Sequence, residues 1–568
     1  MKKIILSILC GALALQASAQ TWQDALFFSE NNYGGTARSV GLGNAMTALG
    51  GDPGSLTFNP AGSAVSSYSQ VVFTSGLSIS SAKTQGISEA AGKLPVGLGD
   101  KVSTGYTRFK VPNGGIILYF PSGNRHGYQG SSMGIMFNST ADYTSRLNAA
   151  GVNQDNSFSG SLASSARGFD PKVLGQEDWF YDGNDPARLP AYADMAGYRG
   201  GMFDAVLDDD GKFTGDYAAV TDALGSTKPG LAAPIYQKYG QQTKGFKSDI
   251  LFNYAMNWDD KFYVGANIGI TVLSYGINEY WYEEPDDPAE FQKHDIKYED
   301  GTIAHFQSLE MKHSLGLKGT GAYFKLGALW RPAGGLRLGA AIQTPTLINL
   351  KETYAYSAET QLSGRYLSPT KTPEFEWVYA LWSPFRVNAG IAYTIGQVAA
   401  LSFDYELSHY GTASFRSRSD DAYSVGSFGG VNRDIHDALG AGQIFRAGVE
   451  VKPVPFLAFR AGYNYITSPQ RAYFKGDKAV TFSFQERASR AQHQVSLGAG
   501  LSLGAFYADL AARLRLVPTD YLIPYNYMTY QTTDKEFYRK VVDLDVVTPQ
   551  IKTDWTYVNV LLTLGLRF

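Results

Sequence analysis

The last eleven residues of the chain alternate between two kinds of side chain. One set of alternate positions holds Val558, Val560, Leu562, Leu564, Leu566 and Phe568, and the other holds Asn559, Leu561, Thr563, Gly565 and Arg567. Successive side chains of a β-strand point to opposite faces, so this pattern predicts one apolar face and one smaller or polar face. A strand with an apolar face for lipid that ends on an aromatic residue is typical of the closing strand of a transmembrane β-barrel.

The same alternation recurs along most of the chain and predicts an all-β fold, a 14-stranded antiparallel transmembrane β-barrel. Its second face is rich in Gly, Ser, Asn and Thr, which suits a confined lumen better than the wet face of a soluble β-sandwich. Short Gly-, Pro-, Asn- and Asp-containing turns alternate with long loops at about 147–245, 283–311, 411–443, 467–490 and 518–551. We expect strands at about 69–81, 103–120, 131–146, 246–257, 261–282, 312–331, 335–356, 375–395, 397–415, 444–453, 456–467, 491–503, 505–517 and 555–568.

The first nineteen residues have the form of a secretory signal. Lys2 and Lys3 precede an apolar run that is too short to span a bilayer, and Ala17-Ser18-Ala19 follows it. We therefore expect a signal peptide over 1–19, cleaved after Ala19, and export to the bacterial outer membrane. The only cysteine, Cys10, lies in this segment, so disulfides and thiolate chemistry are excluded from the mature chain.

Residues 20–68 do not alternate and precede the predicted barrel, which we place at 69–568. They are rich in small residues and contain Asn59, Pro60, Ala61 and Gly62 in succession. A barrel of fourteen strands has a lumen too wide for its own side chains to fill. We therefore predict that 20–68 forms a hatch inside the lumen; the alternative is a periplasmic extension.

The run from Ala45 to Gly51, the motif Asn59–Gly62 and the strand order to Phe568 resemble the FadL/TodX family of outer-membrane transporters, in its Bacteroidetes-type branch. The resemblance covers nearly the whole mature chain. It implies transport of long-chain fatty acids or other hydrophobic compounds, with capture by extracellular loops and lateral release at a kinked third strand. The candidate kink residues are Gly134, Asn138 and Ser139; a lapse in strand register explains their pattern nearly as well.

Two further sets of residues are candidates for function. Charged side chains in the lumen phase of the strands are predicted to form a paired network that holds the hatch, with a substrate path as the alternative. They are Arg337, Arg386, Asp404, Glu406, Arg446, Glu450, Arg460, Asp509, Arg513 and Arg515. Aromatic residues near the loops are candidates for ligand capture or for the membrane interface, namely Phe246, Tyr280, Trp281 and Tyr282.

These observations predict a passive channel for hydrophobic small molecules rather than an enzyme. An outer-membrane adhesin or hydrolase barrel is the alternative, and an energy-coupled transporter would need a much larger plug. The seven His are dispersed, so we expect no metal and no cofactor. Net charge is -3 without a basic patch, so we expect no nucleic-acid partner. Expected partners are the hydrophobic ligand, outer-membrane lipid and, through Phe568, the barrel assembly machinery; we expect a monomer.

Overall fold

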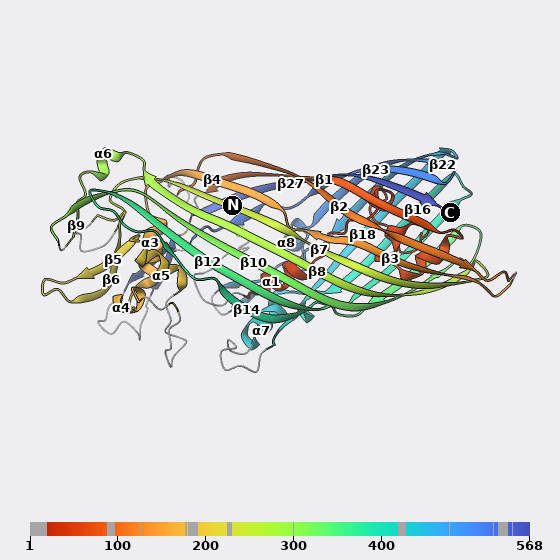
Figure 1. Ribbon diagram of the computed structural model, residues 1–568, viewed down its shortest axis with the longest axis horizontal. Helices are drawn as coiled ribbons and strands as arrows, with labels where there is room; N and C mark the ends of the chain where they lie inside the picture. Colours follow the sequence, from red (N-terminus) through yellow and green to blue (C-terminus); the bar gives the residue numbers. More distant parts are fainter. Residues whose placement is uncertain are drawn as a thin grey trace.

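One closed antiparallel sheet dominates the computed structural model of the protein (Figure 1). The structure describes residues 20–87, 97–124, 126–176, 179, 191–223, 230–298, 300–418, 428–475, 478–525, 527–531, 543–547 and 549–568. The predicted signal peptide lies outside these residues. The strands of the barrel are β1 (Gln70–Ile87), β2 (Val102–Pro121), β3 (Tyr128–Asp142), β4 (Ser145–Asn153), β7 (Ile235–Trp258), β8 (Phe262–Pro285), β10 (Ile303–Trp330), β11 (Leu336–Gln343), β12 (Leu347–Ser363), β14 (Phe375–Trp382), β15 (Arg386–Ile395), β16 (Ala399–His409), β17 (Ser414–Ser417), β18 (Ala441–Val454), β19 (Leu457–Ile466), β22 (Gln492–Leu503), β23 (Phe506–Leu516) and β27 (Gln550–Arg567).

The last strand closes the barrel on the first. β27 pairs with β23 on one side and with β1 on the other, from Gln70 opposite Arg567 to Ile87 opposite Gln550. Four of the barrel strands are interrupted, and each consists of two segments, namely β3 with β4, β11 with β12, β15 with β14, and β16 with β17. Counted in this way the barrel has 14 antiparallel strands, which confirms the predicted fold class.

The outer surface of the barrel is apolar and the inner surface is not. In β27, Leu562 and Leu564 are 42% and 53% exposed, whereas Thr563 between them is fully buried. The same contrast recurs in β8, where Ile268 is 56% exposed and Asn267 is buried. The strand apolar residues therefore point out of the molecule instead of meeting across a dry core, which excludes the β-sandwich. Among the described residues, no helix is long and apolar enough to cross a membrane.

Tight turns join the strands at one end of the barrel. Asp259 and Asp260 between β7 and β8 both have φ of 53°, and Gly504 between β22 and β23 has φ of 61°. This left-handed backbone is what two-residue hairpin turns require. Phe568 lies at the same end, where its backbone N–H donates to Ser69 O at 2.9 Å and its side chain is 63% exposed.

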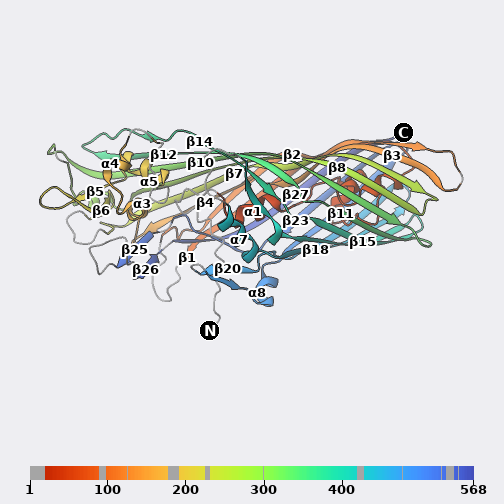
Figure 2. The same ribbon diagram turned by 90° about the horizontal axis from the view of Figure 1, so that it is seen from below.

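Long connections with small elements of their own join the other ends of the strands; some of them lie at the far end of the long axis and others lie near its middle (Figure 2). The connection from β4 to β7 folds into an insertion whose apolar side chains pack against the ends of β10 and β12. Its elements are α3 (Phe158–Ala166), α4 (Pro171–Leu174), α5 (Tyr192–Arg199), β5 (Phe203–Leu207) and β6 (Phe213–Ala219). The other connections contain α6 (Pro288–Phe291), β9 (Ile296–Lys297), β13 (Thr370–Lys371), η4 (Tyr410–Thr412), α7 (Gly429–Ala438), β20 (Ala472–Lys475), β21 (Lys478–Thr481), α8 (Phe484–Ser489), β24 (Asp520–Leu522), β25 (Tyr527–Gln531) and β26 (Asp543–Val547).

Residues 20–68, called the hatch from here on, lie inside the barrel (Figures 1 and 2). The hatch contains α1 (Trp22–Ser29), α2 (Ala37–Gly41), η1 (Pro53–Thr57) and η2 (Pro60–Val65). Each element begins at a side-chain cap: Thr21, Thr36, Asp52 and Asn59 accept hydrogen bonds from the following backbone N–H groups. These caps allow very short helices to form where packing leaves no room for longer ones. The hatch is almost wholly buried from Gly34 to Ala64.

Candidate functional site: a hatched lumen with an interrupted wall

The motif Asn59–Gly62 lies where the hatch contacts β7, β8 and β10. The Asn59 amide donates to Thr47 O at 2.8 Å and to Ala328 O of β10 at 2.9 Å, while its Oδ1 accepts from Ala61 N at 3.1 Å. Asn253 of β7 donates to Pro60 O at 3.0 Å. One side chain thus satisfies two carbonyl groups and caps η2, which an alanine in its place would not do.

Glycines of the barrel wall let the hatch backbone approach the strands directly. A Cβ on Gly265 would lie 2.6 Å from the Pro60 carbonyl carbon, and one on Gly448 would lie 2.5 Å from Leu42 O. Four further wall glycines face the hatch at comparably short range, namely Gly327, Gly339, Gly390 and Gly462. The six glycines come from β8, β10, β11, β15, β18 and β19, so the hatch is fitted closely along this arc of the wall.

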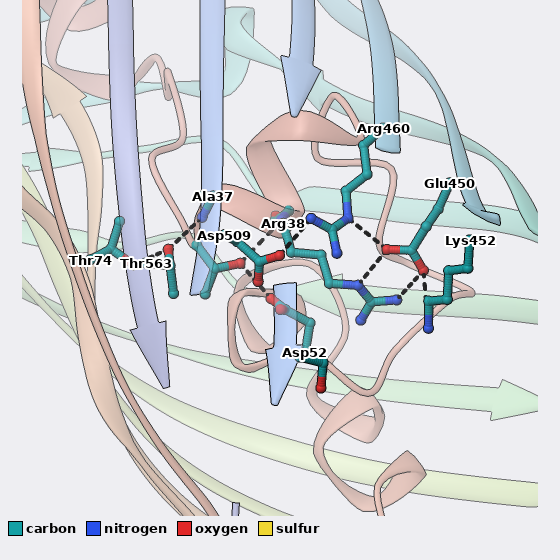
Figure 3. Close-up of polar contacts among 12 residues, drawn as sticks. Ala37, Arg38, Asp52, Thr74, Glu450, Lys452, Arg460, Asp509 and Thr563 are labelled. Atoms are coloured by element: carbon teal, nitrogen blue, oxygen red, sulfur yellow. Dashed lines mark hydrogen bonds and ion pairs between the residues drawn. The ribbon is translucent and has the colours of Figure 1, made fainter. Parts of the chain in front are cut away.

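Ion pairs join the hatch to the lumen charges (Figure 3). Arg38 of α2 binds Glu450 of β18 at 3.0 and 3.1 Å, and Arg460 of β19 binds the same carboxylate at 2.6 Å. Arg460 continues to Asp509 of β23 at 2.6 Å. The side chains of Glu450, Arg460 and Asp509 are 4–5% exposed. Buried charges of this kind are costly unless each is paired, and here the hatch supplies one of the partners.

The remaining predicted lumen charges also face inward. Arg446 binds Glu406 at 2.6 Å, and Glu406 accepts from the Tyr33 hydroxyl of the hatch at 3.1 Å. Asp404 accepts from Thr47 N at 2.7 Å. The others donate to hatch carbonyls or to the wall: Arg337 to Leu49 O, Arg386 to Ser29 O, Arg513 to Tyr33 O and Arg515 to Gln492.

Two wall lysines with the same role escaped prediction from the sequence. Lys247 donates to Phe28 O at 2.7 Å and Glu30 O at 2.6 Å, and Lys325 donates to Thr57 O at 2.7 Å. Both lysines are buried. The sequence could have indicated both lysines, because each occupies an inward-facing position in the alternation of its strand.

The barrel wall is interrupted between β2 and β3. Their pairing runs from Pro121 opposite Gly130 to Asn113 opposite Asn138, and no backbone pair joins β2 to β3 or β4 beyond this point in the described chain. Pro112, the next residue of β2, lacks an N–H and lies in a bulge of the β1–β2 pairing. Asn148 of β4 contacts β2 again through Thr104 at 3.3 Å. We call the gap in the wall between the last backbone pair, Asn113 opposite Asn138, and the Asn148–Thr104 contact the window.

The hatch backbone fills the part of the window that is nearer to the tight-turn end of the barrel. Asn32 N donates to Thr140 O at 2.7 Å, and Gly34 N donates to Ser139 O at 2.7 Å. A Cβ on Gly34 would lie 3.1 Å from Pro112 Cβ, so the hatch passes between β2 and β3. The hatch therefore satisfies carbonyl groups that β2 leaves free.

The three candidate kink residues lie at different positions relative to the window. Asn138 and Ser139 border it, and the register of β3 against β7 shifts between Ser139 and Ala141. Gly134 lies in a regularly paired stretch opposite Ile117. Asn138 also donates to Thr57 Oγ1 of the hatch at 2.9 Å.

Charged side chains cross the part of the window that is nearer to the long loops. Asp142 of β3 binds Arg108 at 3.3 Å and Lys110 at 3.5 Å, both from β2. These are side-chain contacts only, and all three residues are partly exposed. The wall at this height is therefore held by ion pairs instead of a strand ladder.

A cavity of about 100 Å³ lies on the inner side of the window. The hatch lines it with Phe27 and Glu30, β3 with Asp142, and Tyr143 adjoins them. The ring of Phe27 packs 4.8 Å from that of Tyr143. The cavity thus joins an aromatic surface of the hatch to the border of the window.

At the loop end, a groove of about 1200 Å³ separates the insertion from the ends of the wall strands. Its lining includes Tyr198, Phe203, Tyr298 and Leu367. None of these belongs to the four aromatic residues singled out from the sequence. Within the fold this groove combines aromatic and aliphatic side chains on the side where the long loops gather.

Those four aromatic residues are placed as follows. Trp281 faces inward, stacks on Phe158 at 5.0 Å and donates to Pro524 O at 2.7 Å. Phe246, Tyr280 and Tyr282 occupy the opposite strand phase and point outward, and Phe246 is 39% exposed. In the described part of the chain, no group of three or more His, Cys, Asp or Glu residues is positioned to hold a metal ion.

Comparison with known proteins gives structural likenesses only. No protein-family model and no curated protein sequence matches the chain. A Pseudomonas aeruginosa FadL homologue is similar at 12% identity and a TM-score of 0.48, over 94% of this chain and 98% of that one. The P. putida toluene transporter TodX gives 11% and 0.44, over 94% and 99%. The Ralstonia pickettii toluene transporter TbuX gives 12% and 0.45, over 95% and 100%. The first two carry the names of the family that the sequence resembles.

Proposed function

We propose that the protein is an outer-membrane channel for passive uptake of hydrophobic small molecules, such as long-chain fatty acids or monoaromatic compounds. The observation that carries the proposal is the window, which interrupts the β2–β3 ladder beside an internal cavity and is occupied by hatch backbone. If the barrel wall were uninterrupted, an apolar solute could leave the lumen only through water.

The route that this geometry favours begins at the loops and ends in the membrane. Aromatic and aliphatic residues of the extracellular groove capture the ligand, and the cavity beside Phe27 receives it above the hatch. Release then follows through the window into lipid, where an apolar solute is most stable. Only the segment around Asn32 and Gly34 has to move for this step, because the wall glycines and ion pairs hold the rest of the hatch.

A disulfide across the window tests the route. A Cβ on Gly34 lies 3.1 Å from Pro112 Cβ, close to the range that a disulfide needs. The chain has a single cysteine, Cys10, in the predicted signal peptide. The two cysteines of the variant G34C/P112C are therefore the only ones outside that segment. The matched control is S55C/G62C, whose Cβ atoms lie 3.2 Å apart within the hatch.

Uptake of radiolabelled oleate and toluene is measured in a host that lacks a channel of this kind. We expect the oxidised window variant to lose uptake and to recover it on reduction. The control variant should transport equally in both states. Full cross-linking of the window pair with undiminished uptake would refute lateral release, and no uptake of either probe by the wild-type protein would refute the channel.

A further inference from the structure

A second surface feature lies on the outer wall of the barrel, beyond its apolar belt. In β8, the outward positions change from apolar Ile268 and Ile270 to polar Asn278 and Tyr280. Ten residues of a tilted strand place Tyr280 about 25 Å above Ile270 along the barrel axis. This height is on the side of the long loops, where the outer wall has left the hydrocarbon.

Here a groove of about 400 Å³ runs across the sheet. Strand register aligns its lining in two adjacent rows of outward side chains. One row is Asn148, Gly240, Tyr280, Lys312, Ser357 and Lys371, and the other is Arg146, Gln242, Asn278, Ser314 and Ala355. The groove is therefore lined by amides, hydroxyls, one aromatic ring and three cations.

The aromatic ring forms part of the floor of this groove. A Cβ on Gly240 would overlap the Tyr280 ring, so the glycine is what allows the ring to lie flat across β7. The Tyr280 hydroxyl reaches Asn148 Oδ1 at 3.5 Å. A ring face bordered by amide groups is a surface on which a sugar ring packs while its hydroxyls find hydrogen-bond partners.

The charge of the groove is positive. Lys312 binds Glu310 at 2.7 Å, whereas the side chains of Arg146 and Lys371 make no ion pair or hydrogen bond in the described part of the chain. The one carboxylate in the lining, Glu279, points into the barrel instead, where it binds His313 at 3.0 Å and Tyr239 at 2.6 Å. An anion in the groove would thus meet Arg146 and Lys371 without a competing carboxylate, whereas at Lys312 it would compete with Glu310.

We propose that this groove binds the phosphate-bearing sugars of an outer-leaflet glycolipid. The inference rests on the proposed outer-membrane location, because the groove faces the neighbouring lipids and not the mouth of the barrel. A solute bound for the lumen has no reason to bind there. Cations match the phosphates, while the amides and Tyr280 match the sugar rings, so the glycolipid fits both halves of the lining.

The test compares two triple variants of purified full-length protein in non-ionic detergent. The groove variant is R146Q/K312Q/K371Q. The control variant, K212Q/K293Q/R433Q, removes the same charge from exposed residues of the long connections. The probes are deacylated, phosphorylated lipopolysaccharide core oligosaccharide, the same oligosaccharide after dephosphorylation, and intact lipopolysaccharide in vesicles.

We expect the wild-type protein and the control variant to bind the phosphorylated oligosaccharide equally. The groove variant should bind it about tenfold more weakly or worse, since each cation near an anionic surface contributes substantially. Rising salt should weaken the wild-type binding. Binding to lipopolysaccharide vesicles should rank the wild-type protein and the two variants in the same order.

Equal binding by the two triple variants, or equal binding of the dephosphorylated oligosaccharide, would overturn the proposal. Oleate uptake by R146Q/K312Q, which keeps the Lys371 that also lines the loop-end groove, should stay at the wild-type level. A failure of the proposed channel function would appear in uptake and leave glycan binding unchanged, so the two failures are distinguishable.

Discussion

Replacement of Glu450 by alanine should loosen the hatch within an intact barrel. The Glu450 carboxylate is 4% exposed and accepts from Arg38 at 3.0 and 3.1 Å and from Arg460 at 2.6 Å. Removing one partner of a buried ion pair costs about 3–5 kcal/mol, because an uncompensated charge remains. Here the lower value applies, since Arg460 keeps Asp509 and the Arg38 side chain is 20% exposed.

A loss of about 3 kcal/mol raises the population of undocked hatch about 100-fold. Amide hydrogen exchange of residues 36–51, followed by mass spectrometry on the purified protein, measures this population directly. Backbone amides of the barrel strands should keep their protection, because their ladder is unchanged. The expected result is faster exchange confined to the hatch.

Two further variants give this prediction its controls. Lys452 lies 3.9 Å from Glu450 and its side chain is 41% exposed, so K452Q should change exchange little. The double variant R38Q/E450A should recover part of the protection, because it leaves no unpaired hatch charge. Exchange in E450A that equals exchange in K452Q would refute the assignment of hatch stability to this network.

Two other perturbations follow from the structure. Valine at Gly462 would overlap the Gly43 backbone, so G462V should undock the hatch and raise single-channel conductance in planar bilayers, whereas G105V, with no atom within 4 Å of its Cβ, should not. In the insertion, burial raises the pKa of Asp194 from 3.8 to about 8 despite its hydrogen bond to Ser165. The folded insertion therefore binds a proton that its unfolded form releases, so its stability should fall as pH rises from about 4 to about 8. Limited proteolysis of the insertion should show this loss. D194N should remove the part of the loss above about pH 6 and leave the part below it, because burial also raises the pKa of Asp222 in the insertion, to about 6.

The membrane-spanning part of each strand could be predicted from residue alternation alone. The predicted range 456–467 and β19 (Leu457–Ile466) differ by one residue at each end. The prediction failed where strands rise above the apolar belt: β7 begins at Ile235 and not at 246, and β10 at Ile303 and not at 312. There the outward residues are polar, as at Lys238 and Gln242 of β7, so the apolar period disappears although the ladder continues.

The candidate site was only partly predictable for a different reason. Lumen charges such as Glu450 and Arg460 are visible in the strand phase, but their partners are distant in sequence; Arg38 lies 412 residues before Glu450. Pro112 and Gly34 carry no chemical signal of their own. Their position in the window follows only from the closure of the barrel around the hatch.

The sequence by itself determined that this chain forms a fourteen-stranded barrel with an apolar exterior, because side-chain alternation is a local property of each strand. Tertiary structure alone decided where the ladder is interrupted, which wall glycines meet the hatch and which outward polar residues align in one groove. Those features depend on the register between strands and on contacts between residues hundreds of positions apart, and no local pattern records either of them.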